Sequence, residues 1–254
     1  MDDQDVVIQK KVYLDTTVKV SSDIQAILTV IRQRNYSSFH KELNGLDMQG
    51  THLHKANLQG ADLYMANLQG ADLYMANLEG ANLEEANLEG ANLKEAILEE
   101  ANLQMAALER AYLKDAVLYK TDFMNANLEQ ANFIGANLNQ AVLIGGHLVK
   151  ANLKGANLVD ANLEQAILLD TNLEGAILMR ANLKGVILMR ANLKGANLED
   201  ANLEDANLEA ALNLTIDQLS KVKTLYEAKL DPELDKPLKE KHPALFEKPG
   251  HDEP

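Results

Sequence analysis

The stretch from Ala66 to Gly90 reads ANLQG ADLYM ANLEG ANLEE ANLEG, which is one five-residue unit written five times. The unit continues in both directions: from Leu43 to Leu208 every fifth residue is Leu, Met or Phe, at 34 consecutive positions. In the 32 units from Thr51 onward, the residue two places before this central residue is Ala in 27, and the residue directly before it is Asn in 19. Self-similarity at a fixed period is the signature of a repeat architecture.

A period of five residues fits neither the 3.6-residue period of a helix nor the sustained alternation of a long strand. In Ala-Asn-Leu, extended backbone puts Ala and Leu on one side and Asn on the other. Of the 14 glycines, 12 stand two residues after the central residue, where a type II turn requires a positive φ. Short strands joined by such turns predict a chain that coils, with successive coils about 4.8 Å apart.

The pattern A(N/D)LxG resembles the pentapeptide-repeat family, and the match covers residues 41–210. The resemblance implies an all-β solenoid: a right-handed quadrilateral β-helix with one unit on each of its four faces, so that one coil takes four units. On that basis the repeats form a rod on the order of 40 Å long, with Leu and Ala stacked inside it.

The segments that flank the repeats predict a cap at each end, because an open solenoid must protect its terminal backbone and apolar layer. Residues 1–40 are predicted to form an N-terminal arm and a helical cap, since apolar residues recur at helical spacing between Ser22 and Phe39. The β-helix is predicted over 41–212, a C-terminal helical cap over 213–248 and a loose tail over 249–254.

Two helices are predicted in the C-terminal cap. Thr215 and Gln218 have the spacing of a capping box. The apolar residues that follow recur at helical spacing: Leu219, Val222, Leu225 and Tyr226. Asp231-Pro232 is typical of the N-cap and first residue of a second helix, which should end before Pro243.

The composition excludes several classes of protein. The chain carries 38 acidic and 24 basic residues, a formal charge of −14, and no Cys. The acidic excess argues against direct nucleic acid binding, which needs clustered Lys and Arg, and the lack of Cys excludes disulfides and thiolate zinc sites. The acidic residues that follow Met1 argue against a signal peptide, and the absence of a long apolar run argues against a membrane span. We therefore expect a cytoplasmic protein.

No group of residues has the spacing of a catalytic site. His40, His52 and His54 lie close together in the sequence, but their spacing is not that of a metal site, and the last two should point outward. The glycines stand at turns rather than in a phosphate-binding loop. We therefore expect no enzymatic activity, no metal and no cofactor.

One face of the predicted coil departs from the Asn-rich pattern. Residues 20 apart should stack, and on this face three successive coils carry apolar or weakly polar residues directly before and directly after the central Leu. We call these six residues the apolar patch: His147, Val149, Ile167, Leu169, Ile187 and Met189. Exposed apolar surface of this kind usually marks an interface, although ladders of β-branched residues can also serve only to stabilise a coil.

Smaller apolar clusters are expected on neighbouring faces, namely Val142 with Ile144, and Ile177 with Val159 and Met179. Arg180 and Arg190 could border an interface, but ten residues of separation should place them on opposite faces.

Two hypotheses for function come from these observations. The first is a non-enzymatic protein–protein interaction scaffold with an unknown protein partner, a homodimer through the apolar patch being one form of it. The alternative comes from the family resemblance, because some members resemble a DNA duplex in size and charge and bind DNA gyrase. Residues 41–210 hold 24 acidic and 12 basic residues, so the chain could act as an acidic mimic of DNA on gyrase or another DNA-binding enzyme. The nearly uniform Leu centres, with Phe123 and Phe133 as the aromatic exceptions, depart from the gyrase-protecting pattern.

Overall fold

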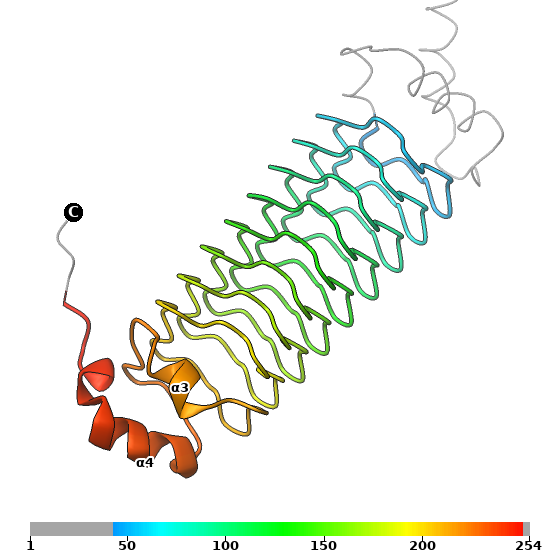
Figure 1. The fold of residues 1–254 in the computed structure, drawn as a ribbon. Coiled ribbons are helices and arrows are strands. Elements are labelled where there is room, and N and C mark those ends of the chain that lie inside the picture. Colours follow the sequence, from blue (N-terminus) through cyan, green and yellow to red (C-terminus); the bar gives the residue numbers. More distant parts are fainter. Residues whose placement is uncertain (1–42, 251–254) are drawn as a thin grey trace, which may run out of the picture.

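The computed structural model describes residues 43–250. The N-terminal arm and helical cap predicted over 1–40 lie outside the described residues, as do residues 251–254 of the predicted tail. Figure 1 shows the described chain as a stack of similar coils that forms a rod, with helices gathered at its C-terminal end.

The coils are held together by parallel backbone pairing at a constant offset. Each residue directly before a central residue, which we call the Asn position, pairs with the residue 20 further on, from Asp47 with Asn67 to Asn192 with Leu212. Each pairing is a single bridge rather than a long strand: Leu58 N–H donates to Asn77 O at 2.6 Å, and Asn77 N–H donates to Ala56 O at 2.9 Å. One coil therefore takes four units, as the resemblance implies.

A tight turn separates each strand from the next and produces the corners of the coil. The N–H of the residue at the Ala position donates to the carbonyl of the preceding central residue, as from Ala61 to Leu58 at 3.0 Å. The second of the two turn residues has a positive φ throughout, near 63° at Gly60 and near 57° at Lys55. This is the geometry that the spacing of the glycines predicts.

The interior of the rod is a continuous aliphatic core. The central residues and the alanines from Leu43 to Leu208 are buried. Phe123 and Phe133 fill two central positions and meet edge to face, with ring centroids 6.2 Å apart and an interplanar angle of 89°. Where Thr replaces Ala, its hydroxyl finds a carbonyl acceptor, as from Thr171 to Leu148 O at 2.7 Å, so the buried polar group is satisfied.

Three short helical segments follow the repeats: α3 (Ile216–Leu219), α4 (Pro232–Lys241) and the 3₁₀ helix η2 (Pro243–Phe246). Thr215 and Gln218 form the predicted capping box. Helix α4 has Asp231 at its N-cap and begins at Pro232, as predicted, and it ends before Pro243. The Asp231 side chain does not cap its own helix but accepts from Ala210 N–H at 3.0 Å, which attaches the helix to the last repeat.

The predicted continuation of the first helix to Tyr226 is wrong. Helix α3 ends at Leu219, and the chain then returns to the coil, where Thr224 pairs with Asn202 and Lys229 pairs with Asn207. Val222 and Leu225 are buried as the apolar spacing requires, but they continue the stack of the rod. The offset between paired residues grows from 20 to 22 because α3 takes up the extra residues.

Candidate interaction surface

The asparagine that precedes each central residue has a structural role on the outer face of the rod. Every Asn or Asp at the Asn position from Asp47 to Asn207 accepts, through Oδ1, a hydrogen bond from the N–H two residues on, at 2.9 to 3.3 Å. That N–H belongs to the first turn residue, and no other group of the described chain accepts from it. The side chain thus satisfies the one turn donor that the backbone leaves free.

The same asparagines also bond to one another along the rod. Asn182 Nδ2 donates to Asn162 Oδ1 at 3.0 Å, and Asn202 Nδ2 donates to Asn182 Oδ1 at 3.2 Å. Our sequence reasoning treated Asn as a merely outward residue and missed this role. This role could have been predicted from the sequence, because Asn stands only two residues before the first turn residue. Asn and Asp side chains commonly accept from the backbone N–H two residues on.

We name the four faces by their central residues in the coil 161–180: the Leu163, Leu168, Leu173 and Leu178 faces. Because one coil takes four units, the Leu168 face lies between the Leu163 and Leu173 faces and opposite the Leu178 face.

All six residues of the apolar patch lie on the Leu168 face, in two columns. His147, Ile167 and Ile187 pair in sequence along the first column, through the parallel bridges of their backbones. Val149, Leu169 and Met189 are the first turn residues that form the second column. The His147 side chain is exposed and the other five residues are half-buried, so the patch reaches solvent.

At the level of the apolar patch, three successive Asn positions lack Asn on the Leu168 face, whereas the Leu163 and Leu178 faces each lack one, at Val142 and Ile177, and the Leu173 face lacks none. On the Leu163 face, Asn162, Asn182 and Asn202 bond in series. On the Leu173 face, Asn172 Nδ2 donates to Asn152 and Asn192 Nδ2 donates to Asn172, both at 3.2 Å.

The substitution of Asn leaves backbone donors open. Among the acceptors of residues 43–250, none takes the N–H of Val149, Leu169 or Met189. Three consecutive coils thus lack the turn hydrogen bond that every asparagine of the repeats supplies.

The smaller clusters are divided between two faces. Val142 and Ile144 lie on the Leu163 face, which does neighbour the patch. The prediction that Ile177 also lies on a neighbouring face is wrong: half a coil separates it from Ile167 and Ile187, so Ile177, Val159 and Met179 lie on the opposite, Leu178 face. Arg180 and Arg190 occupy opposite faces, as predicted.

One edge of the apolar patch carries an ion pair between successive coils. Arg190 Nε and Nη2 donate to Asp170 Oδ1 and Oδ2 at 2.7 and 2.9 Å. These hydrogen bonds hold the pKa of the Asp170 carboxyl below its ordinary value, and the positive charge of Lys150 acts in the same direction. On the opposite face Arg180 binds Asp160 in the same way, at 2.7 and 2.8 Å, and likewise lowers the pKa of Asp160.

Glutamates bound the apolar patch at both ends along the rod. The second column continues as Glu129 before Val149 and as Glu209 after Met189. Within residues 43–250, neither carboxylate forms an ion pair. The patch is therefore an apolar surface between two uncompensated negative charges.

A family profile described as pentapeptide repeats matches residues 42–73, 76–115, 121–158, 156–195 and 187–214, in eight copies. The chain belongs to the pentapeptide-repeat family. Comparison with curated proteins gave no match.

Among solved structures, the pentapeptide-repeat chain is similar to HetL, a pentapeptide repeat protein involved in heterocyst differentiation regulation from the cyanobacterium Nostoc sp. strain PCC 7120. The two are 27% identical, with a TM-score of 0.57 over 77% of this chain and 95% of HetL. It also matches QnrB1, a plasmid-mediated fluoroquinolone resistance protein, at 20% identity and a TM-score of 0.40, over 77% of this chain and 94% of that one.

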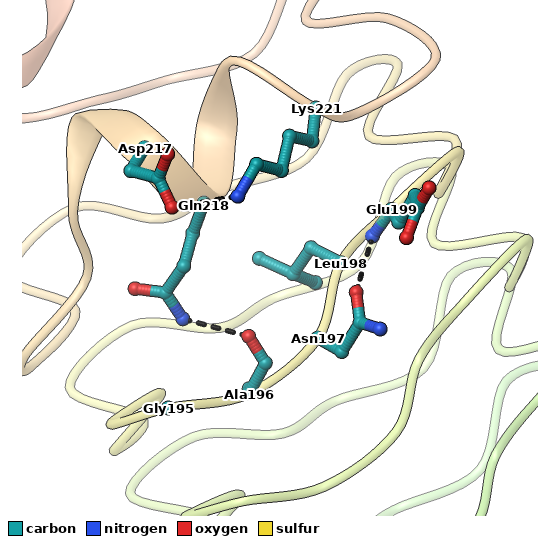
Figure 2. A pocket seen from close by; sticks show the side chains of 8 residues that line it. All are labelled: Gly195, Ala196, Asn197, Leu198, Glu199, Asp217, Gln218 and Lys221. Atoms are coloured by element: carbon teal, nitrogen blue, oxygen red, sulfur yellow. Dashed lines mark hydrogen bonds and ion pairs between the residues drawn. The ribbon is translucent and has the colours of Figure 1, made fainter.

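One pocket of this pentapeptide-repeat protein lies near its C-terminal end. It lies between α3 and the last repeats (Figure 2), and its volume is about 330 Å³. Gln218 crosses it and donates through Nε2 to Leu193 O and Ala196 O at 2.8 and 2.9 Å, while Lys221 pairs with Asp217 at 2.7 Å. The two Gln218 hydrogen bonds attach α3 to the rod. The lining contains no Ser, His or Cys that could act as a nucleophile beside a base.

Within the described residues, neither the histidines nor the helices indicate a second candidate site. His52 and His54 are exposed, and His40 lies outside the described residues. In the described part of the chain no group of three or more acidic or histidine side chains is placed to hold a metal ion. Likewise, no helix found there combines the length and hydropathy that crossing a bilayer demands.

Proposed function

We propose that this pentapeptide-repeat protein is a non-enzymatic scaffold that binds another protein through the apolar patch. The observation that carries the proposal is the absence of asparagine from three successive coils on the Leu168 face, while the Leu173 face keeps its ladder through the same coils and the Leu163 face keeps it from Asn162 onward. Each loss leaves a turn N–H without its side-chain acceptor, which costs stability. The presence of apolar residues at these sites is best explained by a benefit outside the fold itself.

The composition of the apolar patch supports the same proposal. Clustered apolar side chains with few charges are typical of the centre of an interface, with a polar rim around them. Here Arg190 and Asp170 form one rim and Glu129 and Glu209 form the two ends. The ion pair also fixes two of the three coils relative to each other, so the surface is held in one shape.

Affinity capture with three matched proteins tests the proposal. The wild-type chain, the patch variant Ile167→Asn/Ile187→Asn and the opposite-face variant Ile177→Asn are each immobilised and exposed to a lysate of the source cells. A protein that is retained by the wild type and by Ile177→Asn, and lost from the patch variant, supports the proposal. Equal retention by all three proteins, or retention of nothing specific, overturns it.

The alternative function, mimicry of DNA, has support from the charge of the repeats but less from its distribution. Among the described repeats the Leu163 face carries seven acidic residues and one basic residue, whereas the Leu173 face carries four acidic and five basic residues. A DNA duplex presents negatively charged phosphates on all sides, whereas the Leu173 face of this rod carries no net negative charge. Inhibition of gyrase supercoiling that weakens steeply as salt is added would favour this alternative. No inhibition at micromolar protein in low salt would dismiss it.

A further inference from the structure

We propose that the occupant of the apolar patch is a basic amphipathic helix of the partner protein, laid along the rod so that its terminal Lys or Arg residues meet Glu129 and Glu209. This inference rests on the proposed function and adds the chemistry of the partner. It is carried by the spacing of the two columns and by the charges at their ends.

The spacing of the columns matches a helix better than an extended chain. Successive patch residues are one coil apart, about 4.8 Å. Turns of a helix are 5.4 Å apart, so three apolar residues on successive turns stay close to three coils. Residues on one side of an extended strand are about 6.7 Å apart and fall out of step by roughly 4 Å over the same three coils. A helix also presents a stripe wide enough to contact both columns.

The charges of Glu129 and Glu209 indicate the length and the charge of the partner helix. From Glu129 to Glu209 the second column takes four coil steps, about 19 Å, and a helix covers that length in about 13 residues. Neither glutamate has an ion-pair partner within residues 43–250. A helix with a cation at each end and apolar residues on the turns between would neutralise both carboxylates. Gln side chains beside its apolar stripe would offer acceptors to the open N–H groups of Val149, Leu169 and Met189.

A second copy of the chain fits the same surface poorly. If two rods packed antiparallel through the patch, Glu129 of each copy would face Glu209 of the other. If they packed parallel, each glutamate would face its own counterpart. Both arrangements bring like charges together, which opposes association.

The test uses a synthetic helix as the probe. A labelled peptide of about 15 residues carries Lys at both ends, three Leu on one stripe and Ala and Gln elsewhere, with a lactam bridge on its far side to hold it helical. Two control peptides have Glu at both ends or the same Leu residues spread around the helix. Binding is measured by fluorescence anisotropy against the full chain and its variants, at low and at moderate salt.

We expect the basic peptide to bind the wild type and Ile177→Asn equally, and the patch variant Ile167→Asn/Ile187→Asn at least about tenfold more weakly. Glu129→Gln/Glu209→Gln should also weaken binding and should flatten its salt dependence. Equal binding of the acidic or the scrambled peptide, or no binding of the basic one, overturns the inference.

The inference and the proposed function can fail separately. Patch-dependent capture of a lysate protein without binding of the basic peptide leaves the scaffold standing and removes the basic helix as its partner. Light scattering behind size-exclusion chromatography gives the remaining outcome. A wild-type dimer that becomes monomeric in the patch variant would show that a second copy occupies the patch, and that result also overturns the basic helix.

Discussion

Arg190 holds Asp170 through two parallel hydrogen bonds of 2.7 and 2.9 Å, and so connects the two coils that present Leu169 and Met189. A planar guanidinium binds a carboxylate with this fork geometry more specifically than an ammonium group can. The pair lies at the edge of the apolar patch and joins the two coils whose Leu169 and Met189 side chains are half-buried.

The titration of Asp170 should report this contact directly. Its pKa is lowered in the folded chain, so the stability that the contact adds is present above the ordinary Asp range and is lost as the pH falls through the lowered value. We expect Arg190→Gln to return the pKa of Asp170 toward its ordinary value while Asp160, bound by Arg180 on the opposite face, keeps its lowered pKa. Carboxyl carbon chemical shifts followed over an acidic pH series measure both, and an Asp170 that titrates identically in wild type and variant would contradict the assignment.

Hydrogen exchange should separate the capped turns from the open ones. The N–H of Glu164 and the N–H of Glu174 each donate to an asparagine Oδ1 at 3.1 Å, whereas the N–H of Leu169 in the same coil has no acceptor among residues 43–250. We expect the amide of Leu169 to exchange markedly faster than its two neighbours in the coil. Residue-resolved exchange measures this, and a Leu169 amide as protected as that of Glu164 would mean that another group satisfies it.

Removal of one ladder asparagine should be costly because several bonds meet there. Asn182 accepts from Lys184 N–H at 3.3 Å, donates to Asn162 at 3.0 Å and accepts from Asn202 at 3.2 Å. We expect Asn182→Ala to lower the free energy of unfolding by about 1 to 2 kcal/mol. Urea unfolding followed by circular dichroism measures it. Glu199→Ala, at an exposed turn position, is the matched surface control, and an equal loss in both variants would deny the ladder a special role.

Much of the fold could be predicted because the same local residue pattern recurs in each five-residue unit. The turn glycines, the buried Leu and the buried Ala all occupy the places that strand alternation and turn geometry require. The continuation after α3 could not be predicted, since Val222 and Leu225 are three apart and fit a helix as well as a resumed coil. The choice is made by pairing of Thr224 with Asn202, a contact distant in sequence.

The apolar patch was visible in the sequence because a strict offset of 20 residues places its members in register. Its cost was not visible. That cost depends on the hydrogen bond from Asn Oδ1 to the turn N–H, which the position of Asn before a turn makes plausible but which only the structure shows. The position of Ile177 was misjudged for a simpler reason: ten residues are half a coil, which leads to the opposite face.

Replacement by Ala should change the free energy of unfolding in opposite directions at Gly146 and at Gly135. Gly146 stands at an Ala position, where an added Cβ would lie 3.0 Å from Leu143 O and 3.4 Å from Leu148 Cδ1. Alanines occupy that position in the coils before and after, at Ala126 and Ala166, and are buried there. We expect Gly146→Ala to stabilise the chain by about 0.5 to 1 kcal/mol, because it restricts the unfolded state at a site the repeat already accommodates.

Gly135 stands at a turn with φ +67°, where an added Cβ would lie 2.5 Å from Asp115 Oδ1. Gly135→Ala should therefore destabilise by more than the roughly 1 kcal/mol that a positive φ costs an alanine. Gly155→Ala, at φ +65° with no atom within 4 Å, gives the cost of the backbone alone. Urea unfolding of the three variants decides the matter: equal losses at Gly135 and Gly155 would show that the Asp115 side chain moves aside without cost.

The patch variant should be at least as stable as the wild type. A loss of binding by this variant could then be assigned to its changed surface rather than to unfolding. In Ile167→Asn/Ile187→Asn, each new Asn can accept from the open N–H of Leu169 or Met189, and the new side chains can extend the ladder to Asn207, which follows one coil further on. Each restored turn bond is worth on the order of 1 kcal/mol, offset in part by the lost packing of two half-buried Ile side chains.

Urea unfolding of the patch variant, beside the wild type and Ile177→Asn, measures the balance. We expect an unchanged or higher midpoint for the patch variant together with protection of the Leu169 and Met189 amides in hydrogen exchange. A clear loss of stability without new amide protection would mean that the apolar columns stabilise the coil through their own packing. Loss of binding by the patch variant could then no longer be assigned to the surface, and the presence of Ile at these sites would have an explanation within the fold.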